Sequence, residues 1–366
     1  MYKIKITGSM QKNALIVTGA ACLLMTGVVA QADTGTYTLS YPTSGVYGGN
    51  DGNPINGGYN VLNSFLAINN NGTIAGTIND TNLSGAGHGG FAGSSAVIYG
   101  DGSNSAGTVV SGINSAGGIV GTYTIGVGTS SFYSNAANYG SAAPTVTLVD
   151  NNLHGSTNAT TVVGGINDAG TAVGVSTLRN GSQYIFEYNT TTSGYTDLAF
   201  GISGASSISA NAISSNGYIA GTYVDTNGIE QGYVYDGSTW TSITDPNVLG
   251  NTTNLAELTV VTGVNKLGEV VGYYQDANGL DHGFVYDLTN HNFGTNNVNA
   301  SIDDPNSTQS NTQIFGINDK GTIVGTTDGT WGFVGTAQVA AVPVPGAFWL
   351  MSSALAGFGF IKRRKV

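Results

Sequence analysis

The chain has 366 residues, of which 40% are hydrophobic and 57 are glycine, and its formal net charge is −11. Its 19 tyrosines and 12 phenylalanines argue against a disordered chain, because disordered sequences are poor in aromatic residues. The acidic balance argues against a nucleic-acid partner, because phosphates require a basic surface. Apolar residues alternate regularly between turn-forming residues, so we expect a folded all-β protein.

Residues 1–32 have the three parts of a secretory signal peptide. Basic residues are followed by an apolar segment at 14–29 and by the small–x–small cleavage site Ala30-Gln31-Ala32. The alternative is a retained membrane helix, but the polar residues within the segment and the cleavage site favour removal by signal peptidase. Cys22, the single cysteine, lies in this segment, so the processed protein would contain no disulfide and no cysteine metal site.

The acidic residues are confined to the middle of the chain. Residues 33–338 contain all 21 of them but only three basic residues, Arg179, Lys266 and Lys320, which gives a formal net charge of −18. An acidic, exported surface explains this balance. Binding of divalent cations is the alternative explanation, because calcium prefers carboxylate oxygens.

A nine-residue motif occurs six times in this middle region, at intervals of 45 to 53 residues. It consists of an apolar residue, Asn, two variable residues, Gly, one more variable residue, two mostly apolar residues and a second Gly. The six copies begin at Ile68, Ile113, Ile166, Ile213, Val264 and Ile317, and the fourth copy has Ser in place of Asn. A repeat of this length is one supersecondary unit that cannot bury its own apolar face, so its copies are expected to stack.

Each motif predicts a β-hairpin. The Asn starts the turn because its side chain can bond to the main chain two residues on, and the first Gly accepts the positive φ that follows a type I turn. The second Gly lies inside the next strand, where Gly is unfavourable. Its recurrence therefore indicates the close approach of a neighbouring backbone or sheet.

A third strand is expected after each hairpin, and a fourth is expected before several of the motifs. The third-strand segments are 89–91 with 96–99, 131–133, 184–188, 232–236, 283–287 and 331–334; the fourth-strand segments are 37–41, 145–149, 239–243 and 298–302. Four short antiparallel strands in about 45–50 residues have the size of a propeller blade, and a closed ring removes exposed end units. We therefore predict a β-propeller of about six four-stranded blades in residues 33–338, flanked by an N-terminal signal helix and a C-terminal apolar helix.

The repeats resemble the HAF-type extracellular repeat. In that family Gly-Ile-Asn-x-x-Gly-x-Val-Val-Gly is followed by a short strand that contains His-Ala-Phe. The similarity is greatest at residues 263–272 with His282-Gly283-Phe284, and at residues 316–325. The resemblance implies export and repetition, and it carries no activity.

Residues 339–366 have a separate pattern. The segment Val342-Pro343-Val344-Pro345-Gly346 precedes an uncharged stretch at 347–361, and the basic cluster Lys362-Arg363-Arg364-Lys365 follows. The stretch is short for a membrane-spanning helix, which needs about 20 residues, and the basic cluster would stay on the cytoplasmic side. This three-part end resembles the PEP-CTERM sorting signal in its Val-Pro-x-Pro variant.

The PEP-CTERM resemblance implies a route and a destination for the protein. The chain would be held transiently in the inner membrane by its C-terminal transmembrane helix, and an exosortase would then cleave it near the Pro-containing segment. The product would reach the cell surface or extracellular matrix of a Gram-negative bacterium. A plain C-terminal membrane anchor is the alternative interpretation.

Two neighbouring repeats carry the sequence Asp-x-Asn-Gly-x-acid at equivalent places. The residues that offer oxygen ligands are Asp225, Asn227 and Glu230 in one repeat and Asp276, Asn278 and Asp281 in the next. Alternate oxygens around a tight turn suit calcium, so these six residues are the candidate metal ligands. Asn-Gly between two strands is also a plain hairpin signal, and the two interpretations remain alternatives.

No residue is predicted to be catalytic. The sequence contains no nucleophile elbow, no His-Glu-x-x-His motif and no phosphate loop. His88 and His282 precede equivalent Gly-Phe elements, which favours a structural role in the repeat over a metal site. Strand tyrosines could stack on sugars, although they more often pack or lie at a rim; the four considered are Tyr223, Tyr233, Tyr273 and Tyr274.

These patterns favour a non-enzymatic protein with a structural or glycan-associated role at the cell surface. Exopolysaccharide is its expected partner, and no cofactor is expected apart from the calcium considered above. The alternative is a propeller enzyme, a hydrolase or lyase of extracellular polysaccharide. Its catalytic residues would be sought in the long stretches 83–96 and 245–258.

Overall fold

The structure is a computed structural model that describes much of the repeat region. The described residues are 37–40, 64–79, 87–92, 97–98, 107–125, 128–135, 146–148, 160–244, 258–293, 301–304, 307, 311–328 and 331–337. They belong to one compact unit, Thr34–Ala337. Their regular elements are all β-strands, which confirms the all-β class, and none of these residues forms a helix that could span a membrane. The predicted signal helix and C-terminal helix lie outside the described residues.

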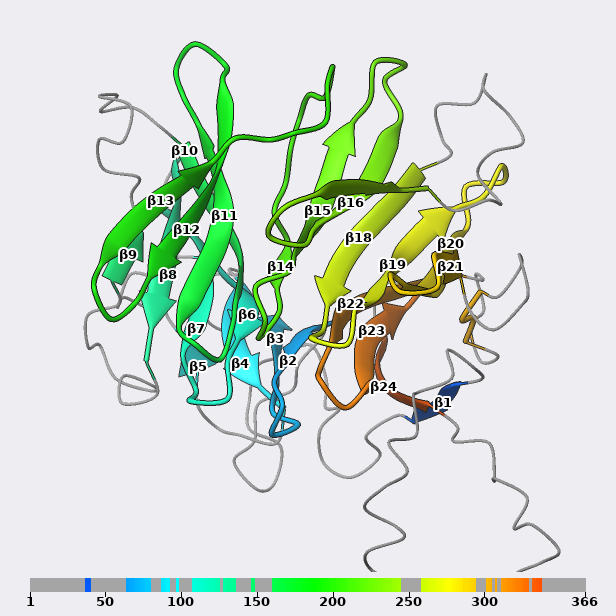
Figure 1. The fold of residues 1–366 in the computed structure, drawn as a ribbon. Helices are drawn as coiled ribbons and strands as arrows, with labels where there is room; N and C mark the ends of the chain where they lie inside the picture. The colour runs from blue at the N-terminus through cyan, green and yellow to red at the C-terminus, as the bar shows by residue number, and fades with distance from the viewer. Residues whose placement is uncertain are drawn as a thin grey trace, which may run out of the picture. The chain divides into compact units, whose positions relative to one another are not determined.

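The strands form six antiparallel sheets of four strands each, as the repeat predicts (Figure 1). Five sheets are continuous in the chain. They are β2 (Ser64–Ile68), β3 (Ile74–Asn79), β4 (Gly87–Phe91) and β5 (Val97–Ile98); β6 (Gly107–Ile113), β7 (Ile119–Ile125), β8 (Gly128–Ser134) and β9 (Val146–Leu148); β10 (Thr160–Ile166), β11 (Thr171–Thr177), β12 (Gln183–Asn189) and β13 (Gly194–Leu198); β14 (Ala212–Ile213), β15 (Ile219–Val224), β16 (Glu230–Tyr235) and β17 (Trp240–Ile243); and β18 (Leu258–Val264), β19 (Glu269–Gln275), β20 (Asp281–Asp287) and β21 (Asn292–Phe293).

The sixth sheet joins strands from the two ends of the repeat region. It contains β22 (Thr312–Ile317), β23 (Ile323–Thr327), β24 (Trp331–Ala337) and β1 (Tyr37–Ser40). β1 runs antiparallel to β24, with Tyr37 opposite Ala337. The strand predicted at 37–41 precedes the first motif in the chain, but in the structure it pairs with β24 and so belongs to the sixth sheet.

The predicted strand at 298–302 is a second correction. In its described part, Ile302 makes one isolated bridge to Gly283 of β20. The fourth strand of the fifth sheet is instead β21, which pairs Phe293 with Tyr286. Strands β13 and β21 were both missed because they follow the third strand after short turns whose residues differ between repeats.

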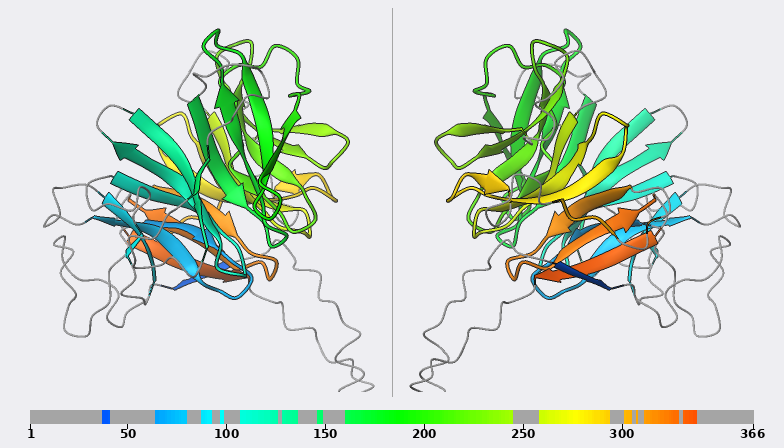
Figure 2. Two further views of the ribbon diagram at one scale, coloured as in Figure 1. Left: turned by 90° about the vertical axis from the view of Figure 1, so that its left-hand side faces the viewer. Right: turned by 90° about the vertical axis from the view of Figure 1, so that its right-hand side faces the viewer.

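Neighbouring sheets contact one another in a closed cycle. The first strands of successive sheets lie side by side, as β2 with β6, β6 with β10, β10 with β14, β14 with β18, β18 with β22, and β22 with β2. Figure 2 shows the orange strands of the sixth sheet beside the blue strands of the first. In the described residues the ladders do not continue from sheet to sheet. Side-chain packing and hydrogen bonds between turns therefore hold the cycle together.

The motif turns have the predicted geometry. In the first copy the Gly72 N–H donates to the Asn69 carbonyl at 3.0 Å, which is a type I turn, and Gly72 then has φ 84°. The equivalent glycines of the other copies also have positive φ: Gly117, Gly170, Gly217, Gly268 and Gly321. A side chain at these positions would be strained, which explains why the first Gly of the motif recurs.

The second Gly of the motif permits the close approach that its recurrence predicted. A Cβ at Gly121 would lie 2.0 Å from the Val109 carbonyl oxygen on the paired strand and 2.9 Å from the Phe132 ring. The ladder shifts register between Val110 and Gly112, so the extra residue pushes this carbonyl toward the glycine. The Phe132 ring, which is fully buried, packs against the place where this Cβ would lie. Gly174, Gly221, Gly272 and Gly325 repeat the arrangement.

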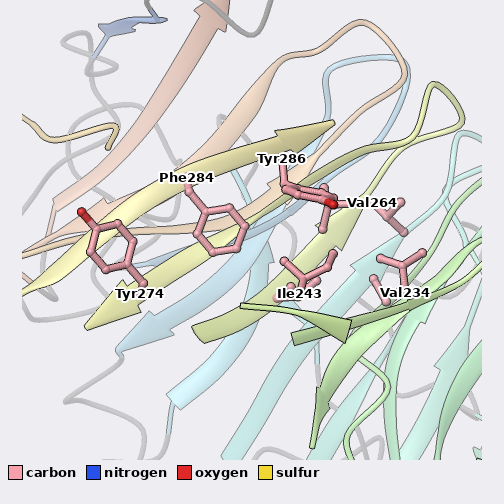
Figure 3. Close-up of a cluster of buried hydrophobic side chains, with 9 residues drawn as sticks. Val234, Ile243, Val264, Tyr274, Phe284 and Tyr286 are labelled. Atoms are coloured by element: carbon pink, nitrogen blue, oxygen red, sulfur yellow. The ribbon is translucent and has the colours of Figure 1, made fainter. Parts of the chain in front are cut away.

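Six buried clusters fill the spaces between neighbouring sheets, and each cluster draws its residues from two sheets. Figure 3 shows the one between the fourth and fifth sheets, where Val234 and Ile243 face Val264, Tyr274 and Phe284. Each fully buried side chain of this size contributes about 1.5–3 kcal/mol. The core is thus divided among the junctions between sheets, as expected for stacked repeats.

Candidate functional site

The Asn of the motif joins neighbouring sheets as well as closing its own turn. Asn69 Oδ1 accepts hydrogen bonds from the N–H groups of Asn71 and Thr73, at 3.0 and 2.9 Å. Its Nδ2 donates to the carbonyl of Asn114, the equivalent residue of the next sheet, at 3.0 Å. Asn114, Asn167, Asn265 and Asn318 make the same bond to the following sheet, and the bond from Asn318 returns to Asn69.

The junction between the fourth and fifth sheets lacks this Asn. Its place is taken by Ser214, whose hydroxyl accepts from the Tyr218 N–H at 2.9 Å and so closes its own turn. Asn216, two residues later, donates instead to the Lys266 carbonyl of the fifth sheet at 3.3 Å. Asn216 is exposed, so water competes for its amide.

The residues that follow the motif Asn gather into one polar group, which we call the axial cluster. Asn70 Nδ2 donates to Asp168 Oδ2 and to Asp319 Oδ2, both at 2.8 Å, although these acids come from the third and sixth sheets. Asp319 Oδ2 also accepts from Ser215 Oγ at 3.0 Å and lies 3.4 Å from Lys266 Nζ. The cluster consists of Asn70, Ser115, Asp168, Ser215, Lys266 and Asp319. Its bonds cross the cycle and tie distant sheets together.

A narrow channel lies next to the axial cluster. Residues in or directly beside the first strands of all six sheets line it, including Ser111, Asn211 and Thr262, and its volume is about 70 Å³. One water molecule needs about 10–15 Å³, so the channel has room for a few waters. It is too small to hold a sugar ring, since ligand pockets usually reach several hundred Å³.

A larger pocket lies between the fourth and fifth sheets, and we call it the inter-sheet pocket. Its volume is about 280 Å³, which is near the lower end of the range for ligand sites. The fourth sheet and its turns provide one wall, with Tyr218, Val234, Asp236 and Thr241, and the fifth provides the other, with Leu267, Gly268, Leu288, Thr289 and His291. Both sheets therefore contribute apolar and polar side chains to the pocket walls.

Local structure places the residues of these walls. Gly268 lies between Tyr218 and Leu288, because a Cβ there would be 3.9 Å from Tyr218 Cε2 and 3.4 Å from Leu288 Cβ. Leu267 occupies the exposed part of the motif turn and is 52% exposed. His291 has φ 51°, a left-handed conformation that is uncommon for residues other than Gly. An exposed leucine and a histidine in the left-handed conformation therefore both border the inter-sheet pocket.

Asp236 gives the inter-sheet pocket its negative charge. Its Oδ1 accepts hydrogen bonds from the N–H groups of Thr239 and Ser238, at 2.7 and 2.8 Å, and from Ser238 Oγ at 2.9 Å. These bonds favour the charged carboxylate, first the bond from Thr239 and then those from Ser238, and they lower the pKa of Asp236.

His291 and Tyr286 lie together beside the pocket. His291 Nδ1 is 3.4 Å from the Tyr286 hydroxyl. Burial, followed by the charge of Asp287, raises the pKa of Tyr286. Tyr286 therefore stays neutral and keeps a hydroxyl hydrogen beside the imidazole.

The two predicted calcium turns form hairpins. Asp225 Oδ1 accepts from the Asn227 and Ile229 N–H groups at 2.8 and 3.0 Å. Asp276 Oδ1 accepts from Asn278 and Leu280 in the same way, both at 2.9 Å. Each acid thus closes its own turn as the motif Asn does.

The carboxyl of Asp276 has a second set of partners. Burial has the largest effect and raises its pKa, but hydrogen bonds from Leu280 and Asn278 and the charge of His282 outweigh burial, so the pKa is lowered. Asn278 Nδ2 donates to Asp276 Oδ2 at 3.0 Å. Both oxygens of Asp276 are therefore engaged within the turn.

The acids that follow the two turns lie in strands. Glu230 begins β16, and Asp281 begins β20. Asp281 accepts from Gln275 Nε2 at 3.0 Å and from Gln313 Nε2 of the sixth sheet at 2.7 Å. Within the described residues, no three His, Cys, Asp or Glu side chains gather as metal ligands would. Calcium binding at these turns stays a prediction.

His282 fastens the fifth sheet to the segment at 301–304. Its Nδ1 lies 2.8 Å from Asp303 Oδ1, and its Nε2 lies 3.6 Å from Asp276 Oδ2. The ring stacks on Tyr274 with the ring centres 5.0 Å apart. Both ring nitrogens face carboxylates, which suits a structural role. The His88 side chain lies outside the described residues.

Three of the four tyrosines considered for sugar stacking are core residues. Tyr233 is 0% exposed, and Tyr223 and Tyr274 are both 6% exposed. Tyr273 is half-buried, with its ring centre 6.3 Å from that of Phe315. Burial, with the charges of Asp281 and Glu230, raises the pKa of Tyr273 to about 12.

Tyr218, Leu267 and His291 of the inter-sheet pocket were missed because each belongs to a position that is variable in the repeat. A signal was nevertheless present, since these three residues differ in kind from several of their counterparts. Tyr218 stands where three of the other copies have Thr73, Thr171 and Thr322, Leu267 where two of them have Asn71 and Asn216, and His291 where the third sheet has Ser193. A search for such departures, rather than for the repeat itself, points to this junction.

Several predicted sites lie outside the described residues. They include the sorting residues 342–346, the basic cluster 362–365 and most of the stretches 83–96 and 245–258. In those two stretches the structure describes residues 87–92 and Leu258.

No family model and no curated protein matches the chain. Among solved structures, it is similar to the SapL1 lectin in complex with alpha methyl fucoside (13% identity, TM-score 0.44, covering 76% of this chain and 94% of the lectin). It is also similar to the lectin of Aleuria aurantia, a six-bladed β-propeller (12% identity, TM-score 0.40, 77% and 96%). TolB from Acinetobacter baumannii matches at 12% identity and TM-score 0.42 over 63% of this chain, which spans 54% of TolB. These likenesses are weak, and the fold and site follow from the strand topology and contacts described above.

Proposed function

We propose that this chain is an exported β-propeller protein that binds glycans without turning them over. The six sheets are its blades, and the closed cycle of contacts between their first strands supports this arrangement. The observation that carries the binding function is the inter-sheet pocket of about 280 Å³, which has walls from two sheets.

The chemistry of the pocket suits a sugar ring. Tyr218, Leu267 and Leu288 offer apolar surface to the C–H face of a pyranose, while Thr241 and Asp236 offer polar groups to its hydroxyls. Sugar hydroxyls need such partners, because a polar group that is buried unpaired costs about 1–3 kcal/mol. The channel, at about 70 Å³, offers no comparable space.

The location is part of the same proposal. Signal peptidase removes residues 1–32, and an exosortase cleaves near residues 342–346 and delivers the domain to the cell surface or matrix. This step is tested by replacing Pro343 and Pro345 with Ala and following the mass and location of the product. The proposed route requires the variant to accumulate in the inner membrane with its C-terminal segment uncleaved; unchanged processing would contradict it.

The binding function is tested on a glycan array with the full chain, with and without added calcium, together with an assay for released saccharide. The matched control is the triple variant Tyr218→Thr, Leu267→Asn, His291→Ser, which restores residues that other copies already use at these positions. Binding by the wild type, its loss in the triple variant and no saccharide release are expected. Saccharide release would favour the hydrolase or lyase alternative. Equal binding by the wild type and the triple variant would show that glycans do not bind in the inter-sheet pocket.

A further inference from the structure

We propose that the inter-sheet pocket selects an amino sugar with a free, protonated amine over its N-acetylated and acidic counterparts. The proposal rests on the glycan-binding function proposed above and adds the class of ligand. Three features of the described structure support it: the geometry of Asp236, the aromatic side chain of Tyr218 in the same pocket, and the distribution of lysine and arginine.

Asp236 presents one carboxylate oxygen for an incoming cation. Its three hydrogen bonds, from Ser238 and Thr239, all go to Oδ1. The same turn in the fifth sheet differs, because Asp287 Oδ1 accepts from the Thr289 N–H while its Oδ2 accepts from Asn290 Nδ2. Among the described residues, hydrogen bonds thus engage only one oxygen of Asp236 but both oxygens of Asp287, and Asp236 is the one that lines the pocket.

Tyr218 adds an aromatic surface to the same pocket. Tyr218 is half-buried, and its ring lies beside Gly268, which has no side chain of its own and also lines the pocket. An ammonium group near an aromatic face is attracted by the ring quadrupole. A carboxylate and an aromatic ring in one pocket together favour a cation over a neutral group of the same size.

Lysine and arginine, which would favour an acidic sugar, are absent from the nine residues that line the pocket. Lys266 lies next to Leu267 in the chain, but its Nζ pairs with Asp319 in the axial cluster at 3.4 Å. Residues 33–338 have a formal net charge of −18, and this net charge disfavours uronic acids and sulfated sugars.

The proposal is tested by calorimetry on the full chain with three tetrasaccharides, of glucosamine, N-acetylglucosamine and galacturonic acid. N-acetylation removes the charge and leaves the ring unchanged. The wild type should bind the glucosamine oligomer about 3- to 10-fold more tightly than the acetylated one, as expected for an exposed ion pair with a cation–π contact. This preference should shrink in 0.5 M salt, because salt screens the exposed charges.

Two single-charge variants locate the preference. Asp236→Asn keeps an oxygen for the turn and removes the charge, so it should abolish the preference for the amine. Asp287→Asn removes one charge from the equivalent turn of the fifth sheet and should leave the preference in place. Equal effects of the two variants, or an equal affinity of the wild type for both neutral and cationic oligomers, would overturn the proposal.

The outcomes separate the two levels of the proposal. The wild type could bind the glucosamine and N-acetylglucosamine oligomers with equal affinity, and the Tyr218→Thr, Leu267→Asn, His291→Ser variant could lose this binding. That result would contradict the preference for amino sugars and would still support the glycan-binding function. Tightest binding of the galacturonic acid oligomer would do the same. If no oligomer binds here and no glycan binds on the array, both proposals fail.

Discussion

Five junctions between sheets share one device, and the junction between the fourth and fifth sheets departs from it. At the five, a buried motif Asn closes its own turn and donates its amide to the next sheet. At the sixth, Ser214 closes the turn, and the amides of Asn211 and of the exposed Asn216 donate to the fifth sheet instead. The inter-sheet pocket opens at this junction.

This comparison shows that the residues which hold the sheets together differ from the residues of the proposed binding site. Residues that recur make turns, close contacts and links between sheets, and they leave little room for a ligand. Tyr218, Leu267 and His291 depart from the repeat, and all three line the pocket at the junction that lost its Asn. Function is therefore expected where the repeat is broken.

The largest effect is expected from breaking a buried link. Asn318→Ala removes two bonds within its turn and the amide bond to Asn69, and leaves buried groups unpaired. The expected loss is about 3 kcal/mol, or a fall of about 6–12 °C in the melting temperature. Asn216→Ala, which removes the exposed link, should cost less than about 1 kcal/mol. Equal losses in the two variants would contradict the distinction between the junctions.

Glu269, a buried acid at the junction between the fifth and sixth sheets, should make the stability of the protein depend on pH. Burial, the largest cause, raises the pKa of Glu269 above its ordinary value of 4.5, against the hydrogen bond from Asn265 and with the charge of Asp287. Because the folded-state pKa is the higher one, the contribution of Glu269 to stability is full below about pH 4.5 and is lost as pH rises through the folded-state pKa.

Glu269→Gln should remove this dependence while keeping an oxygen for the Asn265 amide. The variant is expected to melt at a higher temperature than the wild type at pH 8, and the two melting curves should converge at pH 4. Thermal unfolding monitored by circular dichroism across this range is the measurement. A variant less stable than the wild type at pH 8 would show that the carboxylate itself is stabilising.

Restoring the motif Asn at the junction between the fourth and fifth sheets tests the same comparison in the opposite direction. Ser214→Asn gives the fourth copy the residue that the other five have, and its amide can then reach the fifth sheet. We expect a gain of about 1 kcal/mol, one net hydrogen bond, in the free energy of unfolding measured with denaturant. A loss of stability would mean that this junction has the wrong spacing for the amide.

The smallest effect is expected in the axial cluster. Lys266→Met removes the ion pair with Asp319, in which the lysine side chain is 52% exposed, so the expected loss is below about 1 kcal/mol and vanishes at high salt. Denaturant unfolding at low and high salt measures it. A larger, salt-independent loss would show that the lysine packs rather than pairs.

The sequence predicted what depends on neighbours in the chain. The Asn–Gly turns, the strands beside them and the crowding at the second Gly all follow from residues within one motif. The pairing of Tyr37 with Ala337 did not follow, because it joins segments about 300 residues apart. The amide bonds between sheets were missed for the same reason, since the carbonyl that accepts from Asn69 lies 45 residues away.

The candidate site was harder to predict than the fold, because it is formed by residues that are far apart in the chain. Asp225 and Asp276 were chosen for the pattern of their own turns, and the structure shows those turns closing on themselves. Tyr218 and Leu267 are 49 positions apart, and only the stacking of the fourth sheet on the fifth makes them two walls of one pocket.

The most direct test of the central claim is the affinity of the wild type and of the Tyr218→Thr, Leu267→Asn, His291→Ser variant for the best glycan on the array, measured by calorimetry beside their melting temperatures. A site at the broken junction predicts that binding is lost while the melting temperature stays within about 4 °C, because Leu267 and His291 are exposed and only Tyr218 is half-buried. Unchanged affinity in a variant that folds normally would contradict it.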